Sequence, residues 1–232
     1  MKSYFLSILL PIILASCNTQ PEKEPRAPVV NEQEENTEEK VDTLLTNETI
    51  LFFNQSGYGG FAKTRSAGFD WSKFKLIDVW KEDSLLVTAF NPDKTYFDSY
   101  GRFLKYSPDS SLFVDLDSYN IHISKDKQGR LIGNEEGPDT EISLVDRKKK
   151  EKTRLLFLGP GSSVEEGGWM DEDNIVLMGL QENAGGDSTI PVVWKYHVPT
   201  NTFYLFQSPD TIGVQKQMYS WRKERLKGVT LQ

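Results

Sequence analysis

The sequence predicts an all-β domain made of antiparallel strands. Beyond residue 48, short apolar or aromatic runs recur every 8 to 15 residues, separated by Gly, Pro, Asn, Asp and Ser. No stretch there keeps a helical period for long, and part of the pattern repeats along the chain. Short apolar runs at regular spacing between turn-forming residues are typical of sheets whose strands are joined by hairpins.

The individual strands follow from these runs. Each run holds bulky, aromatic or β-branched residues, which suit a half-buried pleated surface. In chain order we expect strands at residues 50–54, 75–80, 85–90, 103–106, 112–116, 121–124, 131–133, 141–146, 154–158, 168–170, 175–180, 191–197 and 202–206. The pattern changes near the end, where Val214, Met218 and Trp221 lie at helical spacing among basic residues. This spacing predicts a short helix over residues 214–226.

The pattern of strands occurs twice. Residues 106–116 align with residues 169–179 at an offset of 63, and in both an aromatic residue precedes a polar turn and an apolar strand. Later segments, which begin at Leu144 and Val193, align at an offset of 49. The 14-residue difference falls on residues 119–133, which we expect to form an inserted hairpin. The sequence therefore predicts two four-stranded units, residues 103–159 and residues 160–208.

The predicted units resemble the blades of a known fold. Four antiparallel strands, with an aromatic residue before a Ser-Pro-Asp turn at Ser107, are similar to blades of TolB-like and WD-type β-propellers. The resemblance covers about residues 103–208 and implies a ring, which needs about 4 to 8 blades. At about 45 residues a blade, the chain after residue 47 has room for at most about four. We therefore expect a small or partial propeller, with a twisted meander or a β-sandwich as alternatives.

The first residues predict export and lipidation. Lys2 precedes an apolar run over residues 4–14, about half the ~20 residues of a membrane-spanning helix. The run ends in Leu14-Ala15-Ser16-Cys17, which resembles the lipobox of bacterial lipoproteins, and Cys17 is the one cysteine of the chain. The resemblance implies a signal peptide over residues 1–16 and acyl chains on Cys17 that anchor the protein durably. Asn18 follows in place of the Asp that would imply inner-membrane retention. We therefore expect the outer membrane, on its periplasmic or its surface face.

The acidity of the chain is concentrated after the predicted anchor. The whole chain has 34 acidic and 27 basic residues, and residues 18–47 alone hold eight acidic against three basic ones. This proline-containing segment without aromatic residues predicts a disordered tether, or alternatively an acidic recognition tag. The net charge of −7 argues against a general nucleic-acid binder. The predicted organisation is a lipidated tether (17–47), a β domain (48–208, with N-terminal strands and a loop over 48–102) and a basic tail (209–232).

The sequence holds no clear catalytic or cofactor motif, and we expect neither a cofactor nor a metal. His122 and His197 lie on expected strands 75 residues apart and fit no metal-ligating pattern. Alternating carboxylates at Asp115 and Asp117, and at Asp171 and Asp173, are weak candidates for calcium. Asp and Asn also stabilise turns through their own backbone, which is the plainer explanation.

A glycine-rich, aromatic segment over residues 54–71 is the best candidate for a ligand loop. Its glycines permit close approach of a ligand, while its aromatic and basic side chains offer stacking faces and hydrogen-bond donors. The alternative is aromatic packing beneath a long loop. The candidate residues are Tyr58, Phe61, Lys63, Arg65, Phe69 and Trp71.

These observations predict a lipid-anchored protein of the bacterial cell envelope. We expect its β domain to bind a protein, a peptide or a glycan without catalysis, because loops carried on a sheet scaffold commonly serve recognition. One alternative is an enzyme that cleaves envelope polysaccharide with paired carboxylates, which 34 acidic residues do not allow us to select. A third possibility is a self-protection lipoprotein that blocks a toxin.

Overall fold

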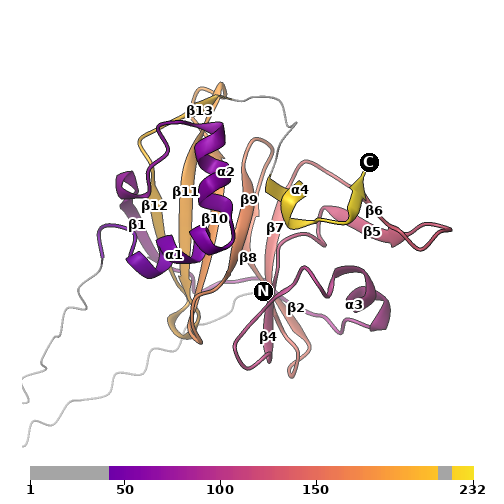
Figure 1. Ribbon diagram of the computed structural model, residues 1–232. Helices are drawn as coiled ribbons and strands as arrows, with labels where there is room; N and C mark the ends of the chain where they lie inside the picture. Colours follow the sequence, from indigo (N-terminus) through magenta and orange to yellow (C-terminus); the bar gives the residue numbers. More distant parts are fainter. Residues whose placement is uncertain (1–41, 214–220) are drawn as a thin grey trace, which may run out of the picture. The chain divides into compact units, whose positions relative to one another are not determined.

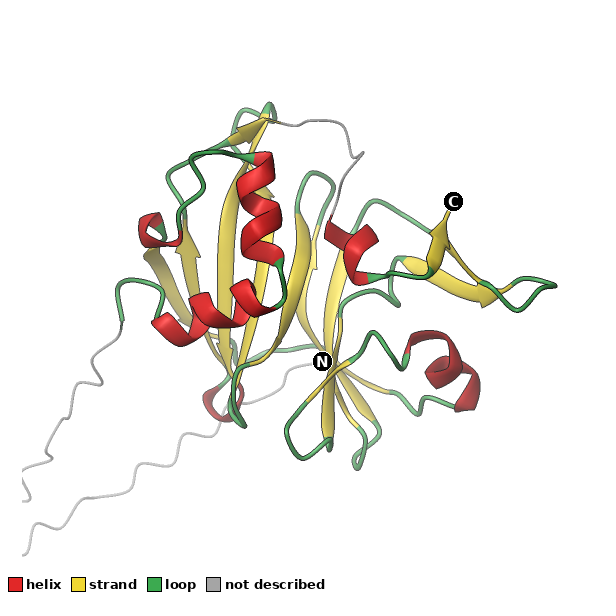
Figure 2. Cartoon of the chain, in the orientation of Figure 1, coloured by secondary structure: helices red, strands yellow, loops and turns green. Residues whose placement is uncertain are grey.

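The computed structural model describes residues 42–213 and 221–232, and this part of the chain is mostly β-structure in three sheets (Figures 1 and 2). The expected signal peptide, the expected lipobox and most of the expected tether lie outside the described residues. So do residues 214–220 of the expected helix. Leu45 is buried, so the folded part begins slightly before residue 48.

Sheet A has the strand order β1-β12-β11-β10-β9, and β13 also pairs with β11. Every pair in it is antiparallel. Its strands are β1 (Lys75–Lys81), β9 (Ser163–Trp169), β10 (Asn174–Glu182), β11 (Ser188–His197), β12 (Thr202–Gln207) and β13 (Ile212–Gly213). A short 3-10 helix, η2 (Val198–Thr200), connects β11 to β12.

Sheets B and C complete the β-structure. Sheet B is antiparallel with the order β2-β8-β7-β4-β3, and sheet C has the order β14-β6-β5, in which β14 runs parallel to β6. The strands of sheet B are β2 (Val87–Ala89), β3 (Lys105–Tyr106), β4 (Leu112–Asp115), β7 (Thr140–Asp146) and β8 (Glu151–Leu158). Those of sheet C are β5 (Ile121–Lys125), β6 (Leu131–Glu135) and β14 (Val229–Leu231).

Two four-stranded units are present in the described part of the chain. Strands β9, β10, β11 and β12 form one four-stranded meander, and β3, β4, β7 and β8 form the other. The expected insert is the β5–β6 hairpin, which leaves sheet B between β4 and β7. An earlier strand extends each unit, since β1 pairs with β12 and β2 pairs with β8. The described residues form no closed ring of blades, so the propeller expected from the resemblance is not found there.

The units instead pack face to face. One apolar cluster joins Val114, Ile142 and Leu144 of sheet B to Leu177 and Trp194 of sheet A. A second cluster covers the opposite face of sheet A with helices, and a third lies between sheet B, a helix and sheet C. Figure 1 shows the resulting succession of helices, sheet A and sheet B. Burial of apolar area on both faces of sheets A and B supplies most of the driving force for this arrangement.

The helices over sheet A were not predicted. The expected strand at 50–54 is wrong, because α1 (Asn47–Gln55) begins at Thr46, whose hydroxyl accepts the Thr49 amide as an N-cap. Residues 49 and 53 then lie one turn apart on the buried face of α1. The expected loop after it contains α2 (Tyr58–Arg65) and a 3-10 helix, η1 (Trp71–Lys73). A side chain at Gly59 would meet the Asn54 amide at 2.1 Å, so this glycine allows close packing of α2 on α1.

One further helix differs from the expectations, and the expected short C-terminal helix is confirmed. Helix α3 (Lys94–Tyr100) was not predicted, and its N-cap is Asp93, whose carboxylate accepts the Tyr96 amide. The end of the chain holds α4 (Trp221–Arg225) within the expected helical range. The expected basic tail is not free of the domain, because Leu226 is buried and β14 continues sheet C.

Candidate functional site

A β-bulge in β9 places two adjacent carboxylates on one face of sheet A. Glu166 pairs with Met178 of β10 and Val164 pairs with Gly179, so Glu165 is an extra residue without a partner in the ladder. Gly179 leaves room for the bulge, because a β-carbon there would lie 2.0 Å from the Ser163 carbonyl oxygen. Both glutamates are almost fully buried. The bulge thus lets consecutive side chains reach the same layer of helices.

Glu165 binds residues of α2. Its carboxylate accepts a hydrogen bond from the Tyr58 hydroxyl at 3.0 Å and forms an ion pair with Arg65, also at 3.0 Å. Burial of the phenol, together with the Glu165 charge, raises the pKa of Tyr58 well above its usual value. Tyr58 therefore remains a hydrogen-bond donor to Glu165 at any physiological pH.

Glu166 binds residues from β3 and α4. The Lys105 amine forms an ion pair with it at 2.9 Å, and the Trp221 indole N–H donates a hydrogen bond at 2.6 Å. Trp221 also packs edge to face against Tyr58, with ring centroids 5.6 Å apart. The two carboxylates therefore hold α2, α4 and β3 against the edge strand of sheet A.

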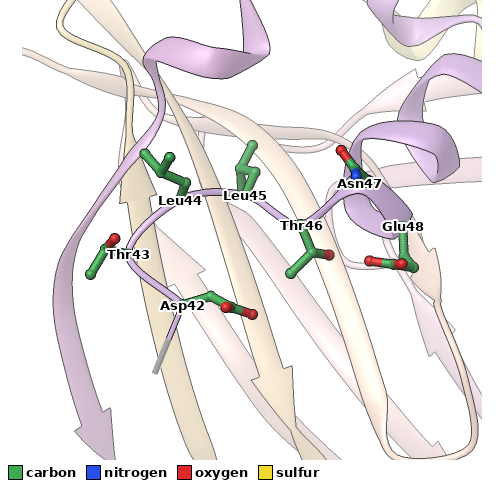
Figure 3. Close-up of a pocket in the computed structure, with 7 residues that line it drawn as sticks. All are labelled: Asp42, Thr43, Leu44, Leu45, Thr46, Asn47 and Glu48. Atoms are coloured by element: carbon green, nitrogen blue, oxygen red, sulfur yellow. The ribbon is translucent and has the colours of Figure 1, made fainter. Parts of the chain in front are cut away.

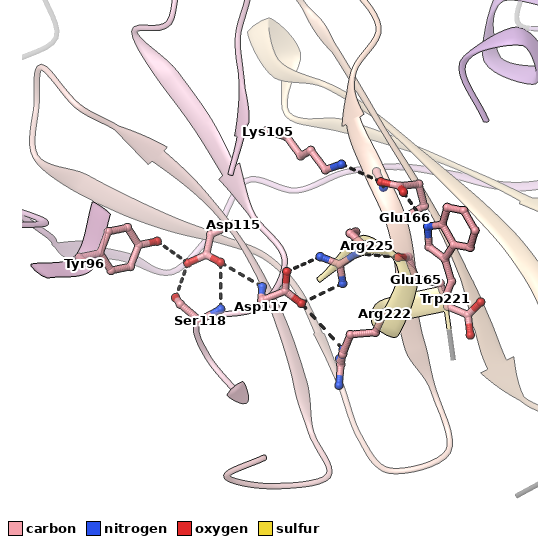
Figure 4. Close-up of polar contacts among 11 residues, drawn as sticks. Tyr96, Lys105, Asp115, Asp117, Ser118, Glu165, Glu166, Trp221, Arg222 and Arg225 are labelled. Atoms are coloured by element: carbon pink, nitrogen blue, oxygen red, sulfur yellow. Dashed lines mark hydrogen bonds and ion pairs between the residues drawn. The ribbon is translucent and has the colours of Figure 1, made fainter. Parts of the chain in front are cut away.

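A third buried carboxylate, Asp117, lies between β4 and β5. Two guanidinium nitrogens of Arg225 bind its two oxygens, and the side chains of both residues are only 3% exposed (Figure 4). The third nitrogen, Nε, donates to the Glu165 backbone carbonyl at 2.9 Å. Arg222 lies 3.8 Å from Asp117 and 3.6 Å from Glu135 of β6. This buried ionic network links all three sheets through α4.

The buried ionic network is internally satisfied. Its three carboxylates face Arg65, Lys105, Arg222 and Arg225, and no described buried side-chain nitrogen or oxygen lacks a hydrogen-bond partner. Buried charges are tolerated when they are paired and hydrogen-bonded in this way. A general acid or base needs a free proton position in a cleft, which these carboxylates do not offer. The network therefore acts as a structural clamp.

The clamp fixes the turn that carries Tyr119. Oδ1 of Asp115 accepts the backbone amides of Asp117 and Ser118 at 3.0 and 2.9 Å. Oδ2 accepts the Tyr96 hydroxyl at 2.6 Å and the Ser118 hydroxyl (Figure 4). With Asp117 held by Arg225, the residues that lead into Tyr119 are anchored in the protein. Tyr119 is presented to solvent from a rigid support.

Tyr119 is part of an exposed surface with Phe157 and Arg154 of β8, which we call the aromatic–arginine surface. The Tyr119 and Phe157 rings meet edge to face at 5.8 Å and are 42% and 46% exposed. The Arg154 guanidinium lies over the Phe157 ring at 4.8 Å. Two of its nitrogens, Nε and Nη2, each lie 2.7 Å from buried Glu141. Among the described residues, none accepts a hydrogen bond from the remaining Nη1.

Glu141 is the support of this surface. Its carboxylate also accepts Ser143 and Lys152, at 2.8 and 3.1 Å. Burial alone would raise the pKa of Glu141, but the hydrogen bonds from Ser143, Lys152 and Arg154 outweigh it and the pKa lies below its usual value. Glu141 therefore stays ionised and keeps Arg154 in one orientation.

The residues predicted as a ligand loop are mostly core residues. Tyr58, Phe69 and Trp71 are buried in the apolar cluster over sheet A, and Phe61 packs against it. Arg65 binds Glu165. Lys63 is exposed and does not form a common site with the other candidate residues. The packing alternative describes the placement of these aromatic residues. The glycines serve helix packing, as Gly59 shows.

The weak calcium candidates form turns. Asp115 and Asp117 are engaged as described above, and Asp171 accepts the amides of Asp173 and Asn174. In the described part of the chain, no three His, Cys, Asp or Glu side chains gather as a metal-binding group. His122 is exposed on β5, and His197 contacts the Thr200 hydroxyl.

A surface pocket lies where the chain enters the fold (Figure 3). All seven lining residues belong to one continuous segment, 42–48, which bridges to Lys75 of β1 through Leu44. The pocket therefore brings together no side chains from distant parts of the sequence. A binding site of the usual kind combines polar groups from several elements.

The sequence singled out Asp117, Tyr58 and Arg65 for other roles, and it did not indicate Glu165, Glu166 or the residues of the aromatic–arginine surface. Glu165 and Glu166 precede the expected strand at 168–170, and no residue pattern shows that a bulge turns both to one face. Phe157 and Arg154 lie in an expected strand. Nothing in the sequence of that strand distinguishes these two residues from their neighbours. Only the pairing of β8 with β7 shows that both lie beside Glu141 and Ser143.

Comparisons of the chain with protein-family models, with curated proteins and with solved structures found no match. None of the helices within residues 42–213 and 221–232 has the length and apolar character required to cross a membrane.

The clamp makes a prediction about stability. Asp117→Asn should lower the free energy of unfolding by about 3 to 5 kcal/mol, because Arg225 would keep its charge in a buried site without a counter-charge. Urea unfolding at neutral pH measures this change. The matched control is Asp98→Asn, which removes the partner of Lys94 at an exposed i,i+4 pair and should leave stability unchanged within error. Equal effects of both substitutions would contradict the clamp.

Proposed function

We propose that this protein is a lipid-anchored protein of the bacterial cell envelope that binds a protein partner without catalysis. The observation that carries the proposal is the aromatic–arginine surface. Tyr119 and Phe157 are exposed there, and the Nη1 atom of Arg154 donates no hydrogen bond to a described residue. Tyrosine and arginine are the residue types that contribute most binding energy at protein interfaces. The predicted lipobox at Cys17 supports the anchor.

The support beneath the surface favours recognition. Ordering a flexible arginine on binding normally costs conformational entropy, but Glu141 and Phe157 already hold the Arg154 guanidinium in place. Tyr119 likewise follows directly on residues that Asp115 and Asp117 hold in place. A preorganised surface with one open donor suits an extended or folded polypeptide that offers a carbonyl or carboxylate oxygen to Arg154.

The alternative of a polysaccharide-cleaving enzyme is less well supported. Glu165 and Glu166 are the paired carboxylates that the geometry offers, and each already binds a cation and a second donor. A glycosidase needs one carboxyl group with a raised pKa and access to the glycosidic oxygen. Burial of both glutamates beneath α2 and α4 blocks that access.

Site-specific photocrosslinking tests the binding surface. A photoreactive amino acid at Phe157, in the anchored protein in intact cells, should give a discrete protein adduct that Arg154→Ala removes. The matched control position is Leu51 on α1, which is 55% exposed and lies on a different layer. Absence of an adduct at Phe157, a non-protein adduct, or equal adducts at both positions would contradict a protein partner at this surface.

Membrane fractionation tests the anchor separately. Cys17→Ala should release the protein from the membrane fraction, because the thiol that carries the acyl chains is lost. Treatment of the wild-type membranes with high salt should release none of it. Unchanged fractionation of Cys17→Ala would contradict the lipoprotein assignment and leave the crosslinking result unaffected.

A further inference from the structure

The β7–β8 turn concentrates positive charge in an acidic protein. Arg147, Lys148, Lys149 and Lys150 are consecutive and all exposed, whereas the whole chain has a net charge of −7. Acidic residues near this turn are Asp146 and Glu151, which pair across the hairpin, and Asp109 of the neighbouring turn. Within the described residues, Lys149 alone of the three lysines forms an ion pair, at 3.5 Å from Asp146. Lys148 and Lys150 keep their charge available to an external anion.

The turn is rigid. The Asp146 carboxylate accepts the backbone amides of Lys148 and Lys149 at 2.9 and 2.8 Å. Lys150 has a φ of 59°, in the left-handed region where glycine or asparagine is normally favoured. The chain therefore places a lysine where another residue would fit the backbone better. The turn thus carries a cation at a position where its backbone is strained.

Arg147 joins the turn to a neighbouring aromatic residue. Its guanidinium donates to the Ser110 carbonyl at 2.8 Å and lies about 6.0 Å from the Tyr106 ring, which is 37% exposed. A basic turn whose arginine lies near an exposed tyrosine combines groups that bind anionic headgroups and the membrane interface. Loose solvation of a charged turn would not require this fixed arrangement.

We infer that the turn formed by residues 147–150 is an electrostatic contact site for an anionic lipid surface, which orients the domain against its membrane. The inference rests on the proposed anchor for its setting. If residues 17–47 are the tether that the sequence predicts, a flexible chain of about 30 residues with a root-mean-square length of about 30 Å would hold the domain close to the lipid surface. At the resulting effective concentration, a weak attraction is sufficient to bias orientation. The acidic tether is itself repelled by an anionic surface.

Vesicle binding tests the contact without the anchor. The acyl-free chain from residue 18 onward keeps every described residue and all three apolar clusters. It should sediment with vesicles of equal parts phosphatidylglycerol and phosphatidylcholine at low salt, and not with phosphatidylcholine alone. Replacement of Lys148, Lys149 and Lys150 by glutamine should weaken binding by roughly 100-fold, given the contribution of each lysine near an anionic surface. Added salt should weaken it too.

A matched variant separates this site from general charge. Replacement of exposed Lys63, Lys125 and Lys127 by glutamine removes the same charge elsewhere and should change binding less than about threefold. No binding to the anionic vesicles, equal binding to both vesicles, or equal loss in both variants would overturn the inference. Binding to a soluble polyanion but not to vesicles would also overturn it. Because no acyl group is present, these outcomes are independent of the Cys17→Ala test.

Discussion

The pairing of Asp117 with Arg225 is the interaction on which the rest of the arrangement depends. It joins the turn after β4 to α4, and Arg225 continues to the Glu165 carbonyl of β9. Sheets A and B pack through apolar side chains, but apolar contact alone allows two sheets to slide and rotate. Directional bonds from the Arg225 guanidinium to the turn after β4 and to β9 fix the relative position of the two sheets. The cost of burying these charges is offset only because each group has a partner.

The same clamp determines what the exterior presents. Asp115 and Asp117 hold the start of the turn that carries Tyr119, and Glu141 holds Arg154 on the neighbouring strands. Tyr119 and Arg154 are thus each supported by buried carboxylates with their own hydrogen bonds. A surface supported in this way loses little freedom on binding, and the buried acids are thereby committed to structure. The basic β7–β8 turn follows the same plan, with the Asp146 carboxylate beneath its lysines.

Local pairing made much of the fold predictable. The two four-stranded units and the inserted hairpin follow from apolar runs and turn residues that are neighbours in sequence. The arrangement of β1, β2 and β14 did not follow, because each pairs with a strand far away in the chain. Helices α1 and α2 were not predicted. The N-cap at Thr46 is one polar residue among several in that part of the chain, and the glycines of α2 favour a loop. The bulge at Glu165, which brings Glu165 and Glu166 of the buried ionic network to one face of sheet A, has no signal in the sequence.

Amide hydrogen exchange in an Arg225→Lys variant tests most directly whether the clamp positions the exposed surface. Lysine keeps the charge but cannot bind both Asp117 oxygens and the Glu165 carbonyl at once. The account predicts that protection of the Asp117 and Ser118 amides falls by at least about tenfold, while amides of β10 keep their wild-type protection. Wild-type protection in the turn that carries Tyr119 would contradict it.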